Sequence, residues 1–316
     1  MTPQNAGRQA PYRLIRCLMR LLSHVPRKAL CAAAFPIGRL WYAVDRRHRR
    51  ISLENLTLAM GSQMSPKEIR HTAKANFVQL ARTALEIPGL LKLTRDNVDD
   101  YIVFSGQEHY YQALSRGKGI LFFTAHLGNW ELMALAFSFK FGTPFHVMAR
   151  VLDFEPMDRM MREIRGFSGN TLINKNNSAA IVTRLLNENQ VVGILLDQNA
   201  SWYEGVYVPF FGRVVCTNKG LAMFALRYGA SVLPAFNTRQ PDGRYLTVFE
   251  PPVELIRTGN VSRDIEENTA LFNRIIEKHV RAAPDNWLWI HRRWRIKGIP
   301  ERARRKLKLP PEVMTS

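Results

Sequence analysis

The feature that most constrains the fold is a regular alternation of short apolar runs and helical stretches from residue 101 onward. Six apolar runs have the length and composition of buried strands, and they occupy residues 101–104, 120–124, 145–148, 191–196, 232–236 and 246–249. Helical periodicity fits residues 107–116, 130–140, 155–166, 178–188, 217–228 and 263–282. Strands and helices that alternate at this spacing predict an α/β fold with a largely parallel central sheet flanked by helices.

The region before this alternation is expected to be helical. Residues 12–60 indicate two or three helices, and another is expected from Pro66 to about Glu86, with Pro88-Gly89 after its end. We therefore expect three parts. These are basic amphipathic helices over residues 1–65, the α/β domain over residues 66–298, and a basic C-terminal tail over residues 299–316.

Positive charge is concentrated at the two ends of the chain. The 316 residues include 45 Lys or Arg and 26 Asp or Glu, which gives a net charge of +19. Residues 1–50 contain 11 Lys or Arg and one acid, and residues 291–316 contain nine and two, so the ends carry 17 of the 19 charges. A near-neutral middle with basic ends favours an anionic partner, and nucleic acid and anionic lipid both meet that condition.

Apolar side chains within the basic N-terminal region favour lipid over nucleic acid. Residues 14–22 and 30–44 combine arginines with Leu, Ile, Met and Trp, a pattern typical of a helix at a membrane interface. A nucleic-acid-binding arm has less reason to carry this apolar surface. The run from residue 29 to 44 is interrupted by Pro36 and Arg39, and a membrane span needs about 20 apolar residues. We expect a surface-bound or monotopic N-terminus without a secretory signal, and a short tilted insertion stays open as an alternative.

The strongest chemical signal lies in residues 119–131. An apolar run leads to His126, and Glu131 follows five residues later across a Gly128-Asn129 turn. This order predicts a buried strand that ends at the histidine and a helix that begins near Asn129. Glu131 would then accept the Nδ1 proton and leave Nε2 as a base for a substrate hydroxyl. A core histidine beside a capping glutamate is the structural alternative.

These segments together resemble one family. Gly117-Lys118-Gly119, the apolar strand and the sequence His-Leu-Gly-Asn-Trp-Glu at residues 126–131 look like the lipid A biosynthesis acyltransferases, within the wider glycerolipid acyltransferase group that carries His-x4-Asp or His-x4-Glu. The likeness also covers Arg50, Asn55-Leu56, residues 106–109, Asp197-Gln198, residues 208–212 and residues 289–293. The resemblance implies transfer of an acyl chain from acyl carrier protein or coenzyme A to a hydroxyl of a lipid A precursor or related saccharolipid. We expect Asn129 to contact substrate.

The remaining residue types favour direct attack by the acceptor hydroxyl and no cofactor. A Gly-x-Ser-x-Gly nucleophile elbow is absent from the sequence, so an acyl-enzyme is the less economical mechanism. The histidines at positions 71, 109, 146 and 279 have no neighbours at metal-ligand spacing, and we expect no metal. Three widely spaced cysteines favour a reducing compartment.

Arg150 follows the strand predicted at residues 145–148. A guanidinium fixed there could bind an oxyanion or a phosphate, and it matches an arginine in the family's second sequence block. The family's Asn-Pro a few residues later is replaced here by Asp-Phe-Glu-Pro at residues 153–156, which puts that substrate contact in doubt. An ion pair with Asp153 or Glu155 is the structural alternative.

Asp197 and Gln198 close the strand predicted at residues 191–196. Polar residues at that edge can line the same cleft as His126, and Asp197 is a second candidate carboxylate for the histidine; a turn or helix cap is the alternative. Phe210 and Gly212 belong to a Val-Pro-Phe-Phe-Gly segment that resembles the family's third block. A stiff aromatic segment suits one wall of an acyl-chain groove, although core packing would give the same pattern.

Arg292 and Arg293 belong to a cation–aromatic cluster at residues 291–295. Arginine binds phosphate through two hydrogen bonds, and tryptophan favours the membrane interface. The cluster therefore suits a phosphorylated glycolipid or the phosphopantetheine arm of acyl carrier protein. Docking of a terminal segment by its tryptophans is the alternative.

Together these features predict an O-acyltransferase on the cytoplasmic face of a bacterial inner membrane. Its basic ends would contact anionic lipids and steer acidic acyl carrier protein toward the enzyme. Another glycolipid or lysophospholipid, such as a phosphatidylinositol mannoside, is an alternative acceptor. A nucleic-acid-binding protein and a non-catalytic membrane scaffold are alternatives from other classes, but we expect no nucleic-acid partner.

Overall fold

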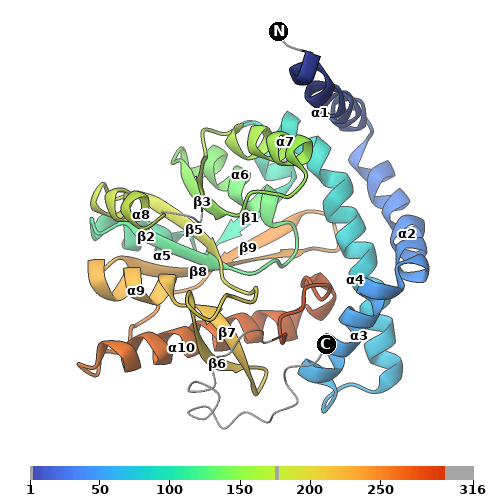
Figure 1. Ribbon diagram of the computed structural model, residues 1–316. Coiled ribbons are helices and arrows are strands. Elements are labelled where there is room, and N and C mark those ends of the chain that lie inside the picture. The colour runs from blue at the N-terminus through green and yellow to red at the C-terminus, as the bar shows by residue number, and fades with distance from the viewer. Residues whose placement is uncertain (1–2, 175–177, 296–316) are drawn as a thin grey trace.

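A seven-stranded sheet lies at the centre of the computed structural model, which describes residues 3–174 and 178–295 (Figure 1). Its strands are β1 (Ile102–Ser105), β2 (Ile120–Thr124), β3 (Phe145–Ala149), β4 (Thr171–Asn174), β5 (Val191–Leu195), β8 (Ser231–Arg239) and β9 (Tyr245–Phe249). They lie in the order β1-β9-β8-β2-β5-β3-β4, and all neighbouring pairs are parallel except β8 and β9. The predicted α/β fold with a largely parallel sheet is confirmed.

Helices cover both faces of this sheet (Figure 1). One face packs against α5 (Gln107–Ser115), α6 (Trp130–Phe141) and α7 (Glu155–Gly166), and the other against α8 (Ser178–Asn187), α9 (Gly220–Tyr228) and α10 (Val261–Ala282). Along β2, Phe122 enters the first core and Phe123 enters the second. Because both faces of β2 are buried, its sequence is a continuous apolar run rather than an alternating one.

The register of two central strands determines where the site forms. Residues Ile120–Thr124 of β2 pair in parallel with residues Val191–Leu195 of β5. His126 and Asp197 each lie two residues beyond the end of their strand. Parallel strands end at the same edge of a sheet, so this register brings the two residues together.

The N-terminal helices pack along one side of the α/β unit. They are α1 (Pro3–Ser23), α2 (Arg27–Val44), α3 (Arg46–Met60) and α4 (Pro66–Glu86), and short 3₁₀ helices lie at η1 (Ile87–Lys92), η2 (Val98–Asp100) and η3 (Pro284–Asn286). Helix α2 approaches α4 closely at Gly38, where an added Cβ would lie 2.5 Å from the Cα of Val78. On α1, the hydroxyl of Tyr12 donates to Glu163 of α7 at 2.5 Å. Helices before residue 65, where we expected the N-terminal part to end, are therefore packed against helices that follow it.

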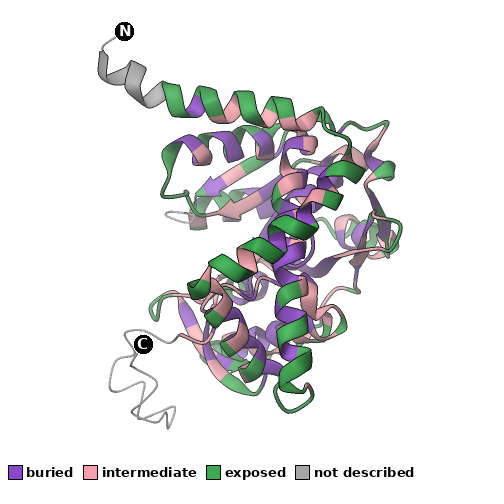
Figure 2. Ribbon diagram, turned by 90° about the vertical axis from the view of Figure 1, so that its right-hand side faces the viewer, coloured by how far each residue is buried: buried purple, intermediate pink, exposed green. Residues whose placement is uncertain are grey.

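Figure 2 shows exposed residues in green along α1 and α2. Several of these exposed residues are large and apolar. These are Leu14, Leu18 and Leu21 on α1, and Phe35, Ile37, Leu40 and Val44 on α2. Within residues 3–174 and 178–295, we find no helix with the length and apolar character that a membrane crossing requires.

Four elements differ from the sequence-based expectations. Strand β4 was not predicted, nor was the antiparallel hairpin of β6 (Gly205–Phe210) and β7 (Arg213–Asn218). The helix predicted at residues 217–228 begins at Gly220, because β7 continues to Asn218. The hairpin packs against α10, where Asn273 donates to the carbonyl of Pro209 at 2.9 Å. The predicted basic tail, residues 299–316, lies outside the described residues.

Candidate active site

His126 lies in a tight connection between β2 and α6. Gly128 has a φ of +63°, and a Cβ there would lie 2.3 Å from the carbonyl oxygen of Asn237, so a residue with a side chain would not fit. Helix α6 begins at Trp130, and the side chain of Asn129 caps it by accepting from the backbone N–H of Leu132 at 3.0 Å. The predicted strand, turn and helix start are confirmed.

The carboxylate bound to His126 belongs to Asp197. Nδ1 of the ring lies 2.8 Å from Oδ1, and the backbone N–H of His126 donates to Oδ2 at 2.9 Å. The indole N–H of Trp287 donates to the same Oδ2 at 2.7 Å. Burial alone would raise the pKa of Asp197, but the charge of His126 and these hydrogen bonds lower it to about 2. An ionised Asp197 holds the proton on Nδ1 and leaves Nε2 free to act as a base.

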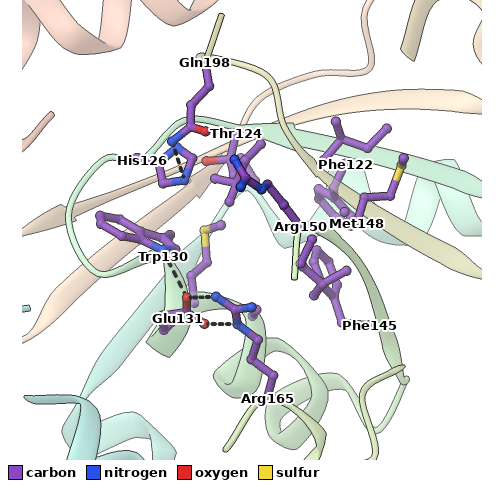
Figure 3. Close-up of a pocket in the computed structure, with 18 of the residues that line it drawn as sticks. Phe122, Thr124, His126, Trp130, Glu131, Phe145, Met148, Arg150, Arg165 and Gln198 are labelled. Carbon is purple, nitrogen blue, oxygen red and sulfur yellow. Dashed lines mark hydrogen bonds and ion pairs between the residues drawn. The ribbon is translucent and has the colours of Figure 1, made fainter. Parts of the chain in front are cut away.

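Glu131 does not occupy the position that we expected. Its two carboxylate oxygens accept from Nη2 and Nε of Arg165, on α7, at 2.6 and 2.8 Å. Figure 3 shows this pair below His126, with Trp130 between them. The ring of Trp130 contacts the ring of His126 edge-on, with 4.9 Å between centroids. The predicted hydrogen bond from Nδ1 to Glu131 is therefore wrong, because the first turn of α6 directs Glu131 toward α7.

Arg165 is a site residue that the sequence reasoning missed. Burial alone would lower the pKa of Arg165, but the hydrogen bond and the charge of Glu131 raise it. Arg165 therefore keeps its positive charge beside Glu131. An arginine in an amphipathic helix more than 30 residues from its partner leaves no local signal in the sequence.

A cavity of about 610 Å³ opens beside His126. Polar residues around it include His126, Glu131, Arg165 and Gln198, which Figure 3 shows directed into it. Its apolar lining includes the aromatic side chains of Phe104, Phe122, Phe137, Phe145 and Phe249. An apolar cavity with a few convergent polar groups at one end is typical of a site for a small molecule or an acyl chain.

Gln198 lies beside the free nitrogen of His126. Its side-chain nitrogen is 3.5 Å from Nε2 (Figure 3). Arg150 also lines the cavity, but its side chain is 77% exposed and Nη2 lies 2.6 Å from Oδ1 of Asp153. The ion pair that we considered as the structural alternative is therefore present.

Four residues expected to contact substrate lie outside the cavity lining, namely Asn129, Asp197, Phe210 and Gly212. Asp197 instead binds His126. Asn129 is fully buried, and its side-chain amide donates to Glu86 at 3.1 Å. Phe210 is fully buried against Trp287 and Trp294. Gly212, with a φ of +70°, lies in the turn of the β6–β7 hairpin. The expected groove wall is therefore wrong, because this segment packs in the core.

Arg292 and Arg293, near the end of the chain, differ in burial, and neither lines the cavity. Arg293 is fully buried, where its guanidinium donates to the carbonyls of Gln198 and Cys216, both at 2.9 Å. Burial lowers the pKa of Arg293 to about 10, with Asp197 opposing the shift. A phosphate cannot reach this side chain, so the expected contact is wrong for Arg293. Arg292 is half-buried and does not line the cavity.

His291, in the same cluster, does line the cavity. The segment that carries it runs beside the His126 loop, because the backbone N–H of Leu288 donates to the carbonyl of His126 at 3.0 Å. Leu127 and Trp287 also form an antiparallel bridge. The sequence pattern placed His291 in the cation–aromatic cluster, but we expected the neighbouring arginines to contact the substrate.

Within the described ranges there is no group of three or more His, Cys, Asp or Glu side chains that could hold a metal ion.

Comparison with known proteins defines the class of enzyme. The family described as "Bacterial lipid A biosynthesis acyltransferase" matches residues 8–296. The chain is 25% identical to the lipid A biosynthesis lauroyltransferase of Escherichia coli, over 89% of this chain and 91% of that protein. It is also 25% identical to the lipid A biosynthesis palmitoleoyltransferase of the same organism, over 88% of both chains. The phosphatidylinositol mannoside acyltransferase of Mycolicibacterium smegmatis is 20% identical, over 91% of this chain and 90% of that protein.

These matches, with a histidine–carboxylate pair at the mouth of an apolar cavity, define an O-acyltransferase. The chain belongs to the bacterial lipid A biosynthesis acyltransferase family.

Proposed function

We propose that this enzyme transfers a fatty acyl chain from acyl carrier protein or coenzyme A to a hydroxyl group of a lipid A precursor or related saccharolipid. One observation carries the proposal. The His126–Asp197 pair lies at the polar end of a cavity lined by six phenylalanines, an arrangement that supports a base beside a site for an acyl chain.

In the proposed reaction, His126 acts as the general base. The acceptor hydroxyl enters next to Nε2, near the present position of the Gln198 amide, and gives its proton to Nε2 as its oxygen attacks the thioester carbon. Asp197 stabilises the imidazolium that forms and keeps the ring in one orientation. The protonated histidine then returns the proton to the thiolate leaving group, so no covalent enzyme intermediate is needed.

The Glu131–Arg165 pair has a positioning role in this proposal. Both side chains are largely buried, and both line the cavity below His126. Glu131 also accepts from the indole N–H of Trp130 at 3.2 Å, and Trp130 contacts the His126 ring. The carboxylate thus acts on the base through Trp130 rather than by direct contact.

Arg150 is the residue that we propose for a phosphate of either substrate. Its guanidinium lies at the cavity but is exposed, and its partner Asp153 is a neighbour three residues away with an 89% exposed side chain. An exposed ion pair of this kind contributes about 1 kcal/mol or less, so a phosphate can displace Asp153 at small cost.

We extend the proposal to the location of the enzyme, on the cytoplasmic face of the bacterial inner membrane. The apolar side chains exposed on α1 and α2 lie among arginines such as Arg16, Arg20 and Arg39. Apolar contact with acyl chains and attraction to anionic headgroups would act together at that surface.

A second acceptor class has a specific observation in its favour. The relative from Mycolicibacterium smegmatis acts, by its name, on a phosphatidylinositol mannoside, and it aligns with nearly the whole of this chain. Another glycolipid or a lysophospholipid is therefore the alternative acceptor.

The test is acyl transfer by purified protein in membrane vesicles. Acyl carrier protein and coenzyme A thioesters are offered with lipid A precursors, phosphatidylinositol mannosides and lysophospholipids. We expect transfer to a lipid A precursor, and its loss in His126→Ala with folding unchanged. Transfer that persists in His126→Ala would contradict the mechanism, and transfer only to another acceptor would contradict the proposed substrate.

A further inference from the structure

The backbone around His291 is rigidly held beside the catalytic loop. Leu288 donates to the carbonyl of His126, and Asn55 on α3 donates from one side-chain nitrogen to the carbonyls of both Trp289 and His291 at 2.7 Å. The side chains of Trp287 and Trp289 between these points are fully buried. His291 therefore has a fixed position relative to His126.

The ring of His291 is held in one tautomer. Its Nε2 lies 3.1 Å from the backbone nitrogen of Asn199, which can only donate a hydrogen bond. Nε2 must therefore accept, and in the neutral ring the proton lies on Nδ1. Within residues 3–174 and 178–295, no protein group is hydrogen-bonded to that Nδ1.

The surroundings also keep this ring neutral. Burial lowers the pKa of His291 to about 4; Asp197 opposes this shift, and His126 and Arg293 add to it. At neutral pH the ring is therefore an uncharged donor at Nδ1. It cannot serve as a second base, because its one unprotonated nitrogen is already bound to Asn199.

His291 belongs to the lining of the cavity that also contains His126, Gln198 and Asn199. A fixed neutral donor beside the base is what acyl transfer to a hydroxyl requires, because negative charge develops on the carbonyl oxygen as the hydroxyl attacks. Arg150 is less suited to that task, since its side chain is exposed and paired with Asp153.

We infer that His291 is a catalytic residue that donates a hydrogen bond from Nδ1 to the carbonyl oxygen of the acyl thioester. The inference rests on the proposed acyl transfer. The hydroxyl oxygen bonds to the carbonyl carbon, its proton moves to Nε2 of His126, and the carbonyl π electrons move to oxygen as an oxyanion. His291 stabilises that oxyanion without losing its own proton. The oxyanion then re-forms the carbonyl, the carbon–sulfur bond breaks, and the thiolate takes the proton from His126.

The test uses two unreactive donor analogues on the carrier that supports transfer by the unsubstituted enzyme. One is an S-alkyl thioether, which lacks the carbonyl oxygen. The other is a ketone in which a CH₂ group replaces the thioester sulfur, so that the carbonyl oxygen is kept. The variants are His291→Phe, which can neither accept from Asn199 nor donate to substrate, and His291→Gln, which can do both.

We expect His291→Phe to reduce kcat by roughly 100- to 1,000-fold, as removal of one oxyanion donor does elsewhere. It should bind the ketone about fivefold more weakly and the thioether unchanged, since a neutral hydrogen bond contributes about 1 kcal/mol. His291→Gln should restore most of both losses.

The inference would be overturned if His291→Phe bound both analogues more weakly by the same factor, or bound both as tightly as the unsubstituted enzyme does. Transfer by the unsubstituted enzyme would still support the proposed function in that case. Recovery of folding but not of ketone affinity in His291→Gln would also overturn the inference. Absence of transfer by the unsubstituted enzyme would overturn both.

Discussion

Nδ1 of His126 lies 2.8 Å from Oδ1 of Asp197, a residue 71 positions later in the chain. The second oxygen of Asp197 holds the backbone of His126 and the indole of Trp287. One buried carboxylate thus fixes the ring of His126, the loop that carries it and the segment that packs beside that loop.

This arrangement predicts a large effect of Asp197→Asn. The amide could hold the ring in the wrong tautomer, with Nε2 protonated, so we expect kcat to fall roughly 100- to 10,000-fold with little change in KM. Steady-state acyl transfer measures the loss, and circular dichroism checks the fold. A rate within threefold of the unsubstituted enzyme would remove Asp197 from the mechanism.

The Glu131–Arg165 pair predicts non-additive variants. Glu131→Gln and Arg165→Gln each break the same pair, so the double variant should lose little more activity than either single variant. Transfer rates of the four proteins give the interaction energy directly. Purely additive losses would indicate that the two side chains act independently on the reaction.

Glu86 predicts a large effect on stability. It is buried, and it accepts from Arg239 and Tyr245, both at 2.7 Å. Glu86→Leu leaves the largely buried guanidinium of Arg239 without its carboxylate partner, so we expect a loss of about 3–5 kcal/mol in the free energy of unfolding. Urea denaturation at pH 7 measures it.

The matched control is Glu54→Ala, which breaks the exposed pair with Arg50 and should cost about 1 kcal/mol or less. Similar losses in the two variants would contradict the importance of burial at Glu86.

His291 predicts a dependence of stability on pH. Its pKa is lowered from 6.5 to about 4, so between these values the unfolded chain binds a proton that the folded protein does not. Stability should therefore fall as pH decreases from about 6.5 to 4, and this contribution should level off below 4. The loss in the free energy of unfolding from His291 should be at most about 3 kcal/mol.

Denaturation of His291→Gln across this pH range isolates the contribution of His291 to stability. This comparison is needed because His146 and His279 also have lowered pKa values and contribute in the same direction. A variant with the same pH slope as the unsubstituted protein would show that His291 does not contribute.

The cavity predicts a change of acyl-chain preference in Gly193→Ala. A Cβ at Gly193 would lie 2.1 Å from the ring of Phe145, which lines the cavity and must move. We expect the preferred chain length to change by roughly one or two carbons, because each buried CH₂ contributes about 0.8 kcal/mol. Competition between thioesters of different length measures it. Gly166→Ala, whose added Cβ meets no atom within 4 Å, is the control and should keep the original preference.

Features that depend on local sequence patterns could be predicted, whereas features that depend on long-range contacts could not. Buried strands such as β2 and β5 are continuous apolar runs, and the Gly128-Asn129 turn has a recognisable chemistry, so the sheet and the position of His126 could be read from the sequence. The partner of His126 could not be chosen in this way. Glu131 is near in sequence, but the direction of a side chain in the first turn of a helix depends on what packs against it.

The burial of the charged side chain of Arg293 could not be predicted from the sequence either. Arg293 looks like a phosphate ligand in the sequence, and only the carbonyls of Gln198 and Cys216, contributed by distant segments, show that it holds the core together. The β6–β7 hairpin lies outside the main sheet and packs on α10, so its strands lack the pattern of the others.

The bridge between Leu127 and Trp287 joins residues about half a chain length apart. A contact of such long range closes late, because much chain must be ordered before its ends can meet. During synthesis the ribosome releases His126 and Asp197 well before Trp287. A nascent chain that has not reached residue 287 therefore contains His126 without the segment that immobilises its loop, and we expect such a chain to be inactive.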